Sequence, residues 1–175
     1  SAPAETVFEH VSKLERRLQW DSLMGQGCKI HQQIDETNSL LYLVMKPIML
    51  GQRAHDYVLL QSTRKDEKDG YIVASRSVIT GELPPIAGLN RGAVLPSGFV
   101  VSPAGDRSSC VLTYVVQMPP LKGISGSFQK SVLAKVSSAM VQRFVRLQCL
   151  LEKPASPVAS STHLVNPATA LNDQL

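Results

Sequence analysis

The clearest hydrophobic pattern lies near the end of the chain, between Ser125 and Glu152. This stretch contains no proline, and its apolar residues recur at steps of three and four, which predicts one long amphipathic helix. Burying an apolar side chain contributes roughly 1.5–3 kcal/mol, so the helix is expected to lie on a broad apolar surface. The apolar stripe consists of Val132, Leu133, Val136, Met140, Phe144, Leu147 and Leu151.

Two interpretations of this stripe stay open. It can be an ordinary core face, or part of it can form the roof of a ligand cavity. Arg143 borders the stripe, and we expect its charged head to reach solvent while its stem covers apolar surface.

Most of the chain before this helix alternates apolar and polar residues, as strands do. A helix is expected over residues 3–16, because Pro3 suits a first helical position and apolar residues follow on one face. Short turns such as 35–38 and 65–70 join the strands, and short turns predict antiparallel pairing. Six strands are expected, over residues 28–34, 39–46, 56–64, 71–79, 92–102 and 109–118.

Several of these strands are apolar on both faces, as in LLYLVM and VLTYVV. A sheet of six strands twists and curls, so a curved sheet closed by one long helix can enclose a hollow. The fold class is therefore α+β. We expect one domain over residues 1–153 and a disordered tail over 154–175, since the tail is rich in small residues and proline.

Composition and charge narrow the range of partners that this chain could bind. The chain has 175 residues and a net charge of +4, which is modest and weakly favours acidic partners such as anionic lipid surfaces. Its basic residues are not interleaved with stacking aromatics, so we expect no nucleic-acid partner. The three cysteines are dispersed, which fits small core thiols in a reducing, cytoplasmic setting. No apolar run is long enough to span a bilayer.

Catalytic and metal-binding signatures are missing from the sequence: there is no P-loop, GxSxG, GxGxxG, HExxH or EF-hand loop. His55 and Asp56 are adjacent, and neighbours on a strand point to opposite faces, so they make a poor catalytic dyad. We therefore expect a protein that is not an enzyme, with no cofactor and no metal.

A cavity under the helix would be lined by the inward face of the central strands. If Leu41, Leu43 and Met45 point inward, Leu59 and Gln61 are their neighbours across the strand pair. A mostly apolar chamber with a few polar groups is the usual lining for a lipid. The expected ligand-binding residues are Leu41, Leu43, Met45, Leu59, Gln61, Val73, Ser75, Val94, Val132, Val136, Met140 and Phe144. The alternative is that the polar members sit at strand ends or bond to water.

The loop after the second strand is unusually apolar. Ile48, Met49 and Leu50 stand between Lys46 and Arg53 and are followed by Gly51. One interpretation is that these side chains pack on the end of the long helix. The other is a gate hinged at Gly51, whose apolar tip makes transient contact with a membrane while the two cations meet lipid phosphates.

Four features together resemble the START (StAR-related lipid transfer) domain family: Trp20-Asp21 after a helix, residues 55–58 opening a strand, Arg91-Gly92, and the long terminal helix. The resemblance covers roughly residues 3–153. It implies a helix-grip fold, with one lipid bound in a tunnel between the curved sheet and the helix, and a gate formed by the matching loop. The sequence of residues 56–101 is most similar to the START domains of acyl-CoA thioesterases and of a kinesin-like protein. A kinesin-like parent would imply a cytoskeletal or centrosomal location.

Three departures from the family pattern matter. The family's first helix and three strands have no counterpart here, which implies an exposed sheet edge prone to association. His55-Asp56-Tyr57 replaces a common Arg-Asp-Phe, so a role for that arginine is not carried over. Sterol-binding members place an acid and an arginine where Leu43 and Gln61 stand, which leaves the ligand open. The function expected is binding or transfer of one hydrophobic lipid. The alternative is a non-catalytic targeting or regulatory domain that contacts other domains of a larger parent protein.

Overall fold

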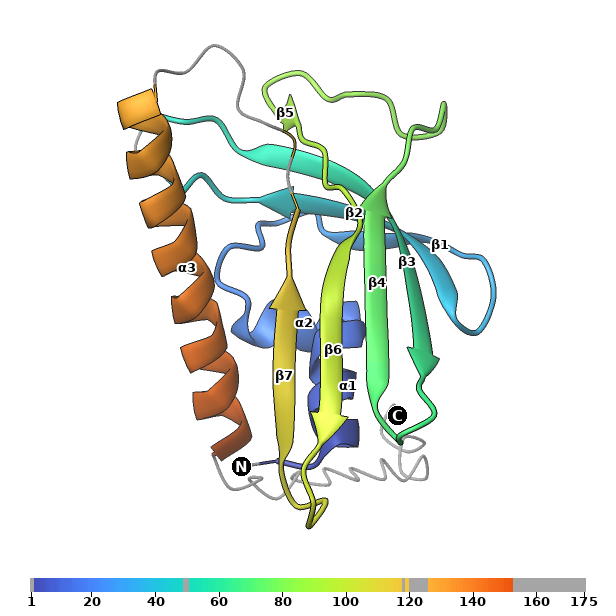
Figure 1. Ribbon diagram of the computed structural model, residues 1–175. Helices are drawn as coiled ribbons and strands as arrows, with labels where there is room; N and C mark the ends of the chain where they lie inside the picture. Colours follow the sequence, from blue (N-terminus) through green and yellow to red (C-terminus); the bar gives the residue numbers. More distant parts are fainter. Residues whose placement is uncertain (1, 49–50, 118, 120–125, 153–175) are drawn as a thin grey trace, which may run out of the picture.

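A curved antiparallel sheet forms the body of the molecule, and one long helix stands beside it (Figure 1). The computed structural model describes residues 2–48, 51–117, 119 and 126–152. This architecture confirms the predicted α+β helix-grip fold. In chain order the elements are α1 (Ala4–Ser12), α2 (Leu14–Trp20), β1 (Lys29–Gln33), β2 (Asn38–Met45), β3 (His55–Lys65), β4 (Tyr71–Ser77), β5 (Asn90–Arg91), β6 (Ser97–Pro103), β7 (Cys110–Val115) and α3 (Gly126–Glu152).

The strands follow the order β1-β2-β3-β4-β6-β7, and every pair along this path is antiparallel. The short strand β5 was not predicted, and it pairs in parallel with the start of β3. The register sets Leu41 opposite Leu59 and Gln61 opposite Ser75. Since partners in a register share a face, these side chains lie on one side of the sheet.

The N-terminal segment differs from the single helix predicted over residues 3–16. It forms two helices, α1 and α2, separated at Lys13, whose backbone is extended. The carbonyl of Ser12, which a continuous helix would pair with the amide of Arg16, accepts a hydrogen bond from the buried side chain of Gln61 at 3.0 Å. The break therefore results from a tertiary contact that local sequence does not reveal.

The two short helices cover one face of the sheet (Figure 1). Their buried residues pack with β4, β6 and the C-terminal half of α3 in one core cluster: Ala4, Val7, Val11, Trp20, Val73, Phe99, Val101 and Leu147. We call this covered face the inner face. On the opposite, outer face, Leu40, Tyr42 and Val58 are buried beneath the connection from β4 to β5, which contributes Leu83. The sheet is therefore covered on both faces at β2 and β3, which explains why these strands are apolar on both faces.

The predicted strand over residues 92–102 begins later, at Ser97. The residues before Ser97 do not form a regular strand ladder. The Ser77 amide donates to the Val94 carbonyl, but the Val94 amide donates to the Ser77 side-chain hydroxyl instead of a backbone carbonyl. At Gly98 the strands come so close that a Cβ atom would lie 1.9 Å from the Val73 carbonyl oxygen. Only glycine fits this position, which explains why a residue that normally weakens strands lies inside β6.

Helix α3 confirms the predicted terminal helix but corrects three side-chain predictions. Leu133 is 59% exposed and does not belong to the inward stripe. Arg143 does not reach solvent, because only 2% of it is exposed. Cys149 is exposed rather than a core thiol. Over the described residues, no helix has the length and apolar character needed to cross a bilayer. The predicted disordered tail lies outside the described residues.

Candidate functional site

The predicted cavity residues on β2 and β3 lie side by side on the inner face. Leu41, Leu43 and Leu59 are buried there, and they pack with Leu14 and Met24 from the α2 region. Their inward direction is as predicted, but the space next to them is filled by those two side chains. This part of the inner face is packed core.

Near the end of β2 and opposite the first half of α3, the inward-facing residues are less well covered. Met45 and Val94 are only partly buried and pack at the margin of the β2–β3 cluster. On α3, Val132, Val136 and Met140 are half-buried, while their neighbours Leu133 and Val141 are exposed. A fully packed helix-on-sheet interface would bury such a row completely, so the first half of α3 covers its surroundings loosely.

The polar candidates have different surroundings. Gln61 is buried, and its side-chain amide donates a hydrogen bond to the Ser12 carbonyl at the junction of α1 and α2. Ser75 is half-buried, opposite Gln61 on one side and Ser97 on the other. Val73 belongs to the core cluster under α1. Gln61 thus has a structural partner, and Ser75 is the more accessible of the two polar groups.

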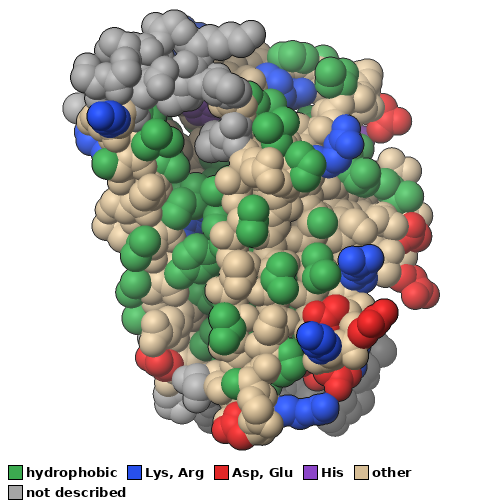
Figure 2. All heavy atoms as spheres, viewed as in Figure 1, with side chains coloured by type: hydrophobic (Ala, Val, Ile, Leu, Met, Phe, Trp, Pro, Cys, Tyr) green, Lys and Arg blue, Asp and Glu red, His purple; other side chains and the backbone are tan. Residues whose placement is uncertain are grey.

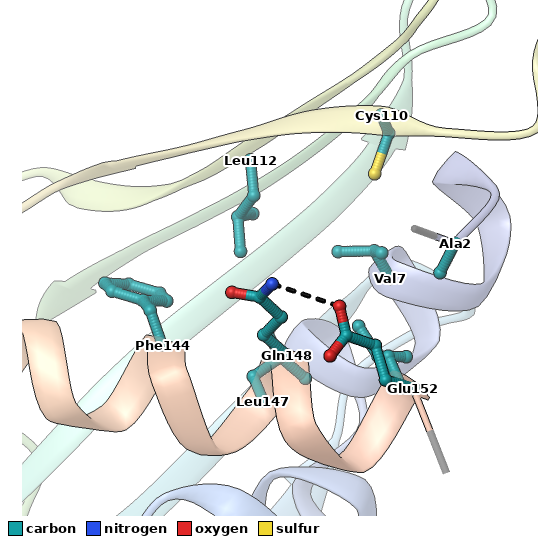
Figure 3. Close-up of a pocket in the computed structure, with 9 residues that line it drawn as sticks. Ala2, Val7, Cys110, Leu112, Phe144, Leu147, Gln148 and Glu152 are labelled. Atoms are coloured by element: carbon teal, nitrogen blue, oxygen red, sulfur yellow. Dashed lines mark hydrogen bonds between the residues drawn. The ribbon is translucent and has the colours of Figure 1, made fainter. Parts of the chain in front are cut away.

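A cavity of about 320 Å³ lies between α1, β7 and the C-terminal half of α3 (Figure 3). This volume is at the lower end of the size of small-molecule sites. Among the lining residues, the exposed Gln148 side chain donates to the Glu152 carboxylate at 3.0 Å. Of the twelve predicted binding residues, Phe144 lines it. The lining consists of Ala2, Val7, Cys110, Leu112, Phe144, Leu147, Gln148, Leu151 and Glu152.

Hydrophobic side chains gather on both sides of the seam between α3 and β7 (Figure 2). From β7, the side chain of Leu112 points into the cavity, and from α3 that of Phe144 does (Figure 3). Phe144 packs edge-on against Tyr114, with ring centroids 5.6 Å apart, and Tyr114 stacks on Phe99 at 4.6 Å. These three rings form an aromatic cluster that connects the cavity to the interior beneath α2.

A buried ionic cluster lies against these rings, and sequence reasoning missed it. The Asp21 carboxylate accepts hydrogen bonds from Arg143 of α3 and, at 3.5 Å, from Arg17 of α2. All three residues are buried, with 9% of Arg17 exposed and 2% each of Asp21 and Arg143. We call this group the inner-face cluster. It ties α3 to α2 and to the turn that follows α2.

The inner-face cluster holds two cations against one anion. The second oxygen of Asp21 accepts the Leu23 amide at 3.3 Å. The Nε atoms of both arginines are buried and have no hydrogen-bond partner among the described residues. The Arg17 guanidinium lies 5.6 Å from the Phe99 ring centroid, and that of Arg143 lies 5.9 Å from Tyr114. Burial lowers the pKa of Arg17, and Asp21 counters this effect.

Two signals in the sequence could have revealed this cluster. Arg17 and Asp21 stand four residues apart, a spacing at which side chains on a helix meet. Arg143 stands between Met140 and Phe144, inside the apolar stripe. A charged residue at an inward helical position is expensive to bury, and such positions carry a partner or a function.

A second buried ionic cluster lies on the outer face. Asp56 is fully buried and accepts hydrogen bonds from Arg91 at 2.8 Å and 3.1 Å and from the Tyr42 hydroxyl at 3.1 Å. Burial acts to raise the pKa of Asp56, but the bonds from Arg91 and Tyr42 outweigh it and hold the pKa below the usual value. Arg91 also donates to the carbonyls of Leu83 and Pro84, so this outer-face cluster fixes the loop over the sheet.

The remaining candidates offer less. His55 stacks on Tyr57 and points away from Asp56, as predicted from their adjacency. Within the described part of the chain, no group of three His, Cys, Asp or Glu side chains could hold a metal ion. In the predicted gate loop, Ile48 is half-buried and Gly51 has a positive φ of 82°, which favours glycine. Met49 and Leu50 lie outside the described residues, so the gate remains a prediction.

Comparison with protein families matches residues 1–150 to the START domain. The chain belongs to the START domain family. START domains generally bind or transfer lipids. The family match confirms the resemblance inferred from Trp20-Asp21 and Arg91-Gly92.

Relatives and solved structures agree with this assignment. The chain is 31% identical over 146 residues to the acetyl-coenzyme A thioesterase of Rattus norvegicus, covering 79% of this chain and 26% of that protein. It is 28% identical over 144 residues to the human START domain-containing protein 10, covering 82% and 47%. Among solved structures, human StAR-related lipid transfer protein 5 superposes with a TM-score of 0.73 at 19% identity, covering 86% of this chain and 70% of that one. The human StarD13 (DLC2) lipid transfer and protein localization domain superposes with a TM-score of 0.67 at 26% sequence identity. The match covers 81% of this chain and 69% of that one.

The chain spans about a quarter of the thioesterase and about half of the START domain-containing protein that it matches. Similarity at 19% identity concerns the fold alone. The activities and partners of those longer proteins are therefore not transferred to this chain by the comparison.

Proposed function

We propose that this START domain binds a single hydrophobic lipid between the inner face of the sheet and α3. The observation that carries the proposal is the loose cover of α3: Val132, Val136 and Met140 are half-buried on its first half, and a cavity opens along its C-terminal half. Inward apolar side chains that are not packed retain surface that a ligand tail can cover, at roughly 25 cal/mol per Å².

The proposed binding surface combines two sets of residues. One is the cavity wall formed by Leu112, Phe144 and Leu147. The other is the sequence-predicted set, in which Met45, Ser75 and Val94 are the more accessible members on the sheet and lie beside the packed leucines of β2 and β3. The loop over residues 48–51 is kept as the proposed gate, with transient membrane contact at its tip.

Direct binding tests this proposal. The folded 175-residue chain is titrated with a fluorescent fatty acid, and we expect saturable uptake near one molecule per chain. Met140→Trp is expected to weaken binding about tenfold or more, because the larger ring fills the space under α3. Absence of saturable uptake by well-folded protein, for fatty acid, sterol and phospholipid alike, would remove the proposal.

Val141→Trp is the matched control, since Val141 is the next residue on α3 and is 63% exposed. The same ring added on the outer side of the helix is expected to leave lipid affinity unchanged. If both tryptophans weaken binding equally, the ligand does not lie under α3.

A second proposal is that the domain is a targeting or regulatory part of a larger protein, kinesin-like or thioesterase. The supporting observation is that the thioesterase relative is about four times longer than the matched region. The full coding sequence tests it: a motor or thioesterase domain in the same polypeptide is the expected result. A coding sequence with no further domain would contradict it.

We also propose that the domain itself is not catalytic, although relatives carry the name thioesterase. Among its described histidines, His31 is paired with Glu82 and His55 with an aromatic ring, and His10 lies on α1 with a buried Nδ1 that has no partner among the described residues. The purified chain is expected to leave acyl-CoA and simple esters intact. Hydrolysis that persists after repurification and is lost on a single histidine substitution would overturn this proposal.

A further inference from the structure

The inner-face cluster carries more positive than negative charge in a buried place. Arg17 and Arg143 share the single carboxylate of Asp21, and both converge on the same oxygen. Arg17 makes the weaker contact, at 3.5 Å. Burying a charge without a full partner costs several kcal/mol, so a protein retains such an arrangement only where something else balances it.

The described surroundings do not supply a second anion. The other groups that act on Arg17 are Arg143, which repels it, and the phenol of Tyr114, which is not a carboxylate. Two nitrogen donors, one Nε on each arginine, are buried without a partner in the described part of the chain. Unused donors on two guanidinium groups are the arrangement that a carboxylate or phosphate recognises, since their planar forks match its oxygens.

The cluster also lies on the path of the proposed ligand. Arg17 stacks over Phe99 and Arg143 over Tyr114, and both rings pack against Phe144. Phe144 in turn lines the cavity. Met140, next to the loosely covered half of α3, contacts the Arg143 guanidinium through its sulfur. An apolar tail under α3 would therefore have its head within reach of the two arginines.

We propose that Arg17 and Arg143 together bind the anionic head, a carboxylate or a phosphate, of an amphipathic ligand whose tail lies under α3. This inference rests on the proposed function and specifies the class of lipid. Asp21 orients Arg143, and the incoming anion supplies the missing negative charge. Because Arg143 belongs to α3, head-group binding also strengthens the attachment of α3 to the body.

Three ligands with the same twelve-carbon tail test the proposal: laurate, dodecyl phosphate and dodecanol. Affinities are measured at pH 8 by displacement of a fluorescent fatty acid from the full chain. We expect laurate and dodecyl phosphate to bind at least about tenfold more tightly than dodecanol, the effect of a charge-assisted hydrogen bond. Equal affinities for all three would overturn the anionic head while leaving the proposed lipid binding intact. Failure of all three would remove the proposed function itself.

Arg17→Gln removes the surplus charge but keeps the Asp21–Arg143 pair, so the fold is expected to survive. It should reduce the preference for laurate over dodecanol to about threefold or less. Arg143→Gln is expected to do the same, and Arg17→Lys to retain part of the preference because it retains the charge. A preference unchanged in both glutamine variants would contradict the proposal.

The chain offers matched controls on the same helices. Arg16 on α2 and Arg146 on α3 are exposed, so Arg16→Gln and Arg146→Gln change net charge by the same amount without touching the cluster. Both should leave the laurate preference unchanged. If they reduce it as much as Arg17→Gln, the preference comes from general surface charge and the proposal fails.

Free anions distinguish a lipid head from a bare ion. Acetate and inorganic phosphate, added alone, should neither displace the fluorescent fatty acid at millimolar concentration nor raise the melting temperature beyond salt controls. Displacement by inorganic phosphate as tight as that by dodecyl phosphate would show a site for a free anion, and would overturn the assignment to a lipid.

Discussion

The two buried ionic clusters, on opposite faces of one sheet, are built differently. On the outer face, Asp56 and Arg91 form a pair of equal and opposite charge, and Arg91 uses its remaining donors on two loop carbonyls. On the inner face, Asp21 is shared by two arginines, each with an unused buried donor. The outer-face cluster is balanced in charge within the protein, although one oxygen of Asp56 has no hydrogen-bond partner among the described residues, whereas the inner-face cluster carries a surplus positive charge.

This difference separates a structural ion pair from a candidate binding site. A buried pair of equal and opposite charge holds its elements in place, which suits a loop that closes over a sheet. A buried excess of one charge is stable only with a further partner, which suits a site that receives a ligand. Burial alone does not distinguish the two, because both aspartates are almost completely buried. The balance of charges distinguishes them, because the outer-face cluster pairs one acid with one arginine and the inner-face cluster pairs one acid with two.

The largest effect is expected for Asp21→Asn. It removes the only carboxylate of the inner-face cluster among the described residues and leaves two buried guanidinium groups uncompensated. We expect a loss of about 4 kcal/mol in the free energy of unfolding at pH 7, measured by urea denaturation. Asp69→Asn, at an exposed ion pair, serves as control and should have no such effect. A small loss for Asp21→Asn would mean that the cluster is more solvated than its burial indicates.

Arg91→Gln is expected to cost somewhat less, about 3 kcal/mol, because it leaves one buried carboxylate with the Tyr42 hydroxyl still bonded to it. The same urea titration measures this loss. Arg76→Gln on the neighbouring part of the sheet is the control, since Arg76 is exposed. If both variants unfold at the same urea concentration, the outer-face cluster does not hold the loop over the sheet.

The cost of Arg91→Gln should also depend on pH. In the wild type the pKa of Asp56 is lowered, so its stabilising contribution is complete above the ordinary carboxyl pKa of about 3.9 and is lost as pH falls through the lowered pKa. Without Arg91, burial favours the protonated acid. The difference in unfolding free energy between the two proteins should therefore shrink between pH 6 and pH 3. Unfolding curves that stay parallel over this range would contradict the assigned cause.

The smallest effect is expected for Arg17→Gln, and this variant compares the two clusters most sharply. Removing the surplus cation leaves one acid with one arginine, as on the outer face. We expect the free energy of unfolding without ligand to change by less than about 1 kcal/mol, in contrast to Arg91→Gln. A loss as large as that of Arg91→Gln would show that Arg17 is a structural partner and that the inner-face cluster needs no ligand.

The sequence predicted the fold well because periodicity reports burial directly. Six of the strands and the terminal helix follow from the apolar pattern, and the turn lengths set their antiparallel order. The break at Lys13 could not be predicted, because it depends on Gln61, a residue 49 positions from Ser12 in the chain. The strand β5 is two residues long and has no pattern of its own.

The candidate site was less predictable. Inward directions on β2 and β3 follow from alternation, but whether that face is filled depends on Leu14 and Met24, which pack there from a distant segment. Arg143 was expected to reach solvent because arginine at the border of an apolar stripe usually does. Its burial follows from Asp21, 122 positions away in the chain. Contacts of this kind are set by tertiary packing, which no local pattern encodes.

The measurement that tests the central claim most directly is native mass spectrometry of the intact chain after incubation with laurate. The account predicts one bound laurate per folded chain, much reduced in Met140→Trp and retained in Val141→Trp. A folded chain that carries no adduct at saturating laurate, or several adducts that the Met140→Trp substitution does not affect, would contradict a single lipid site beneath α3.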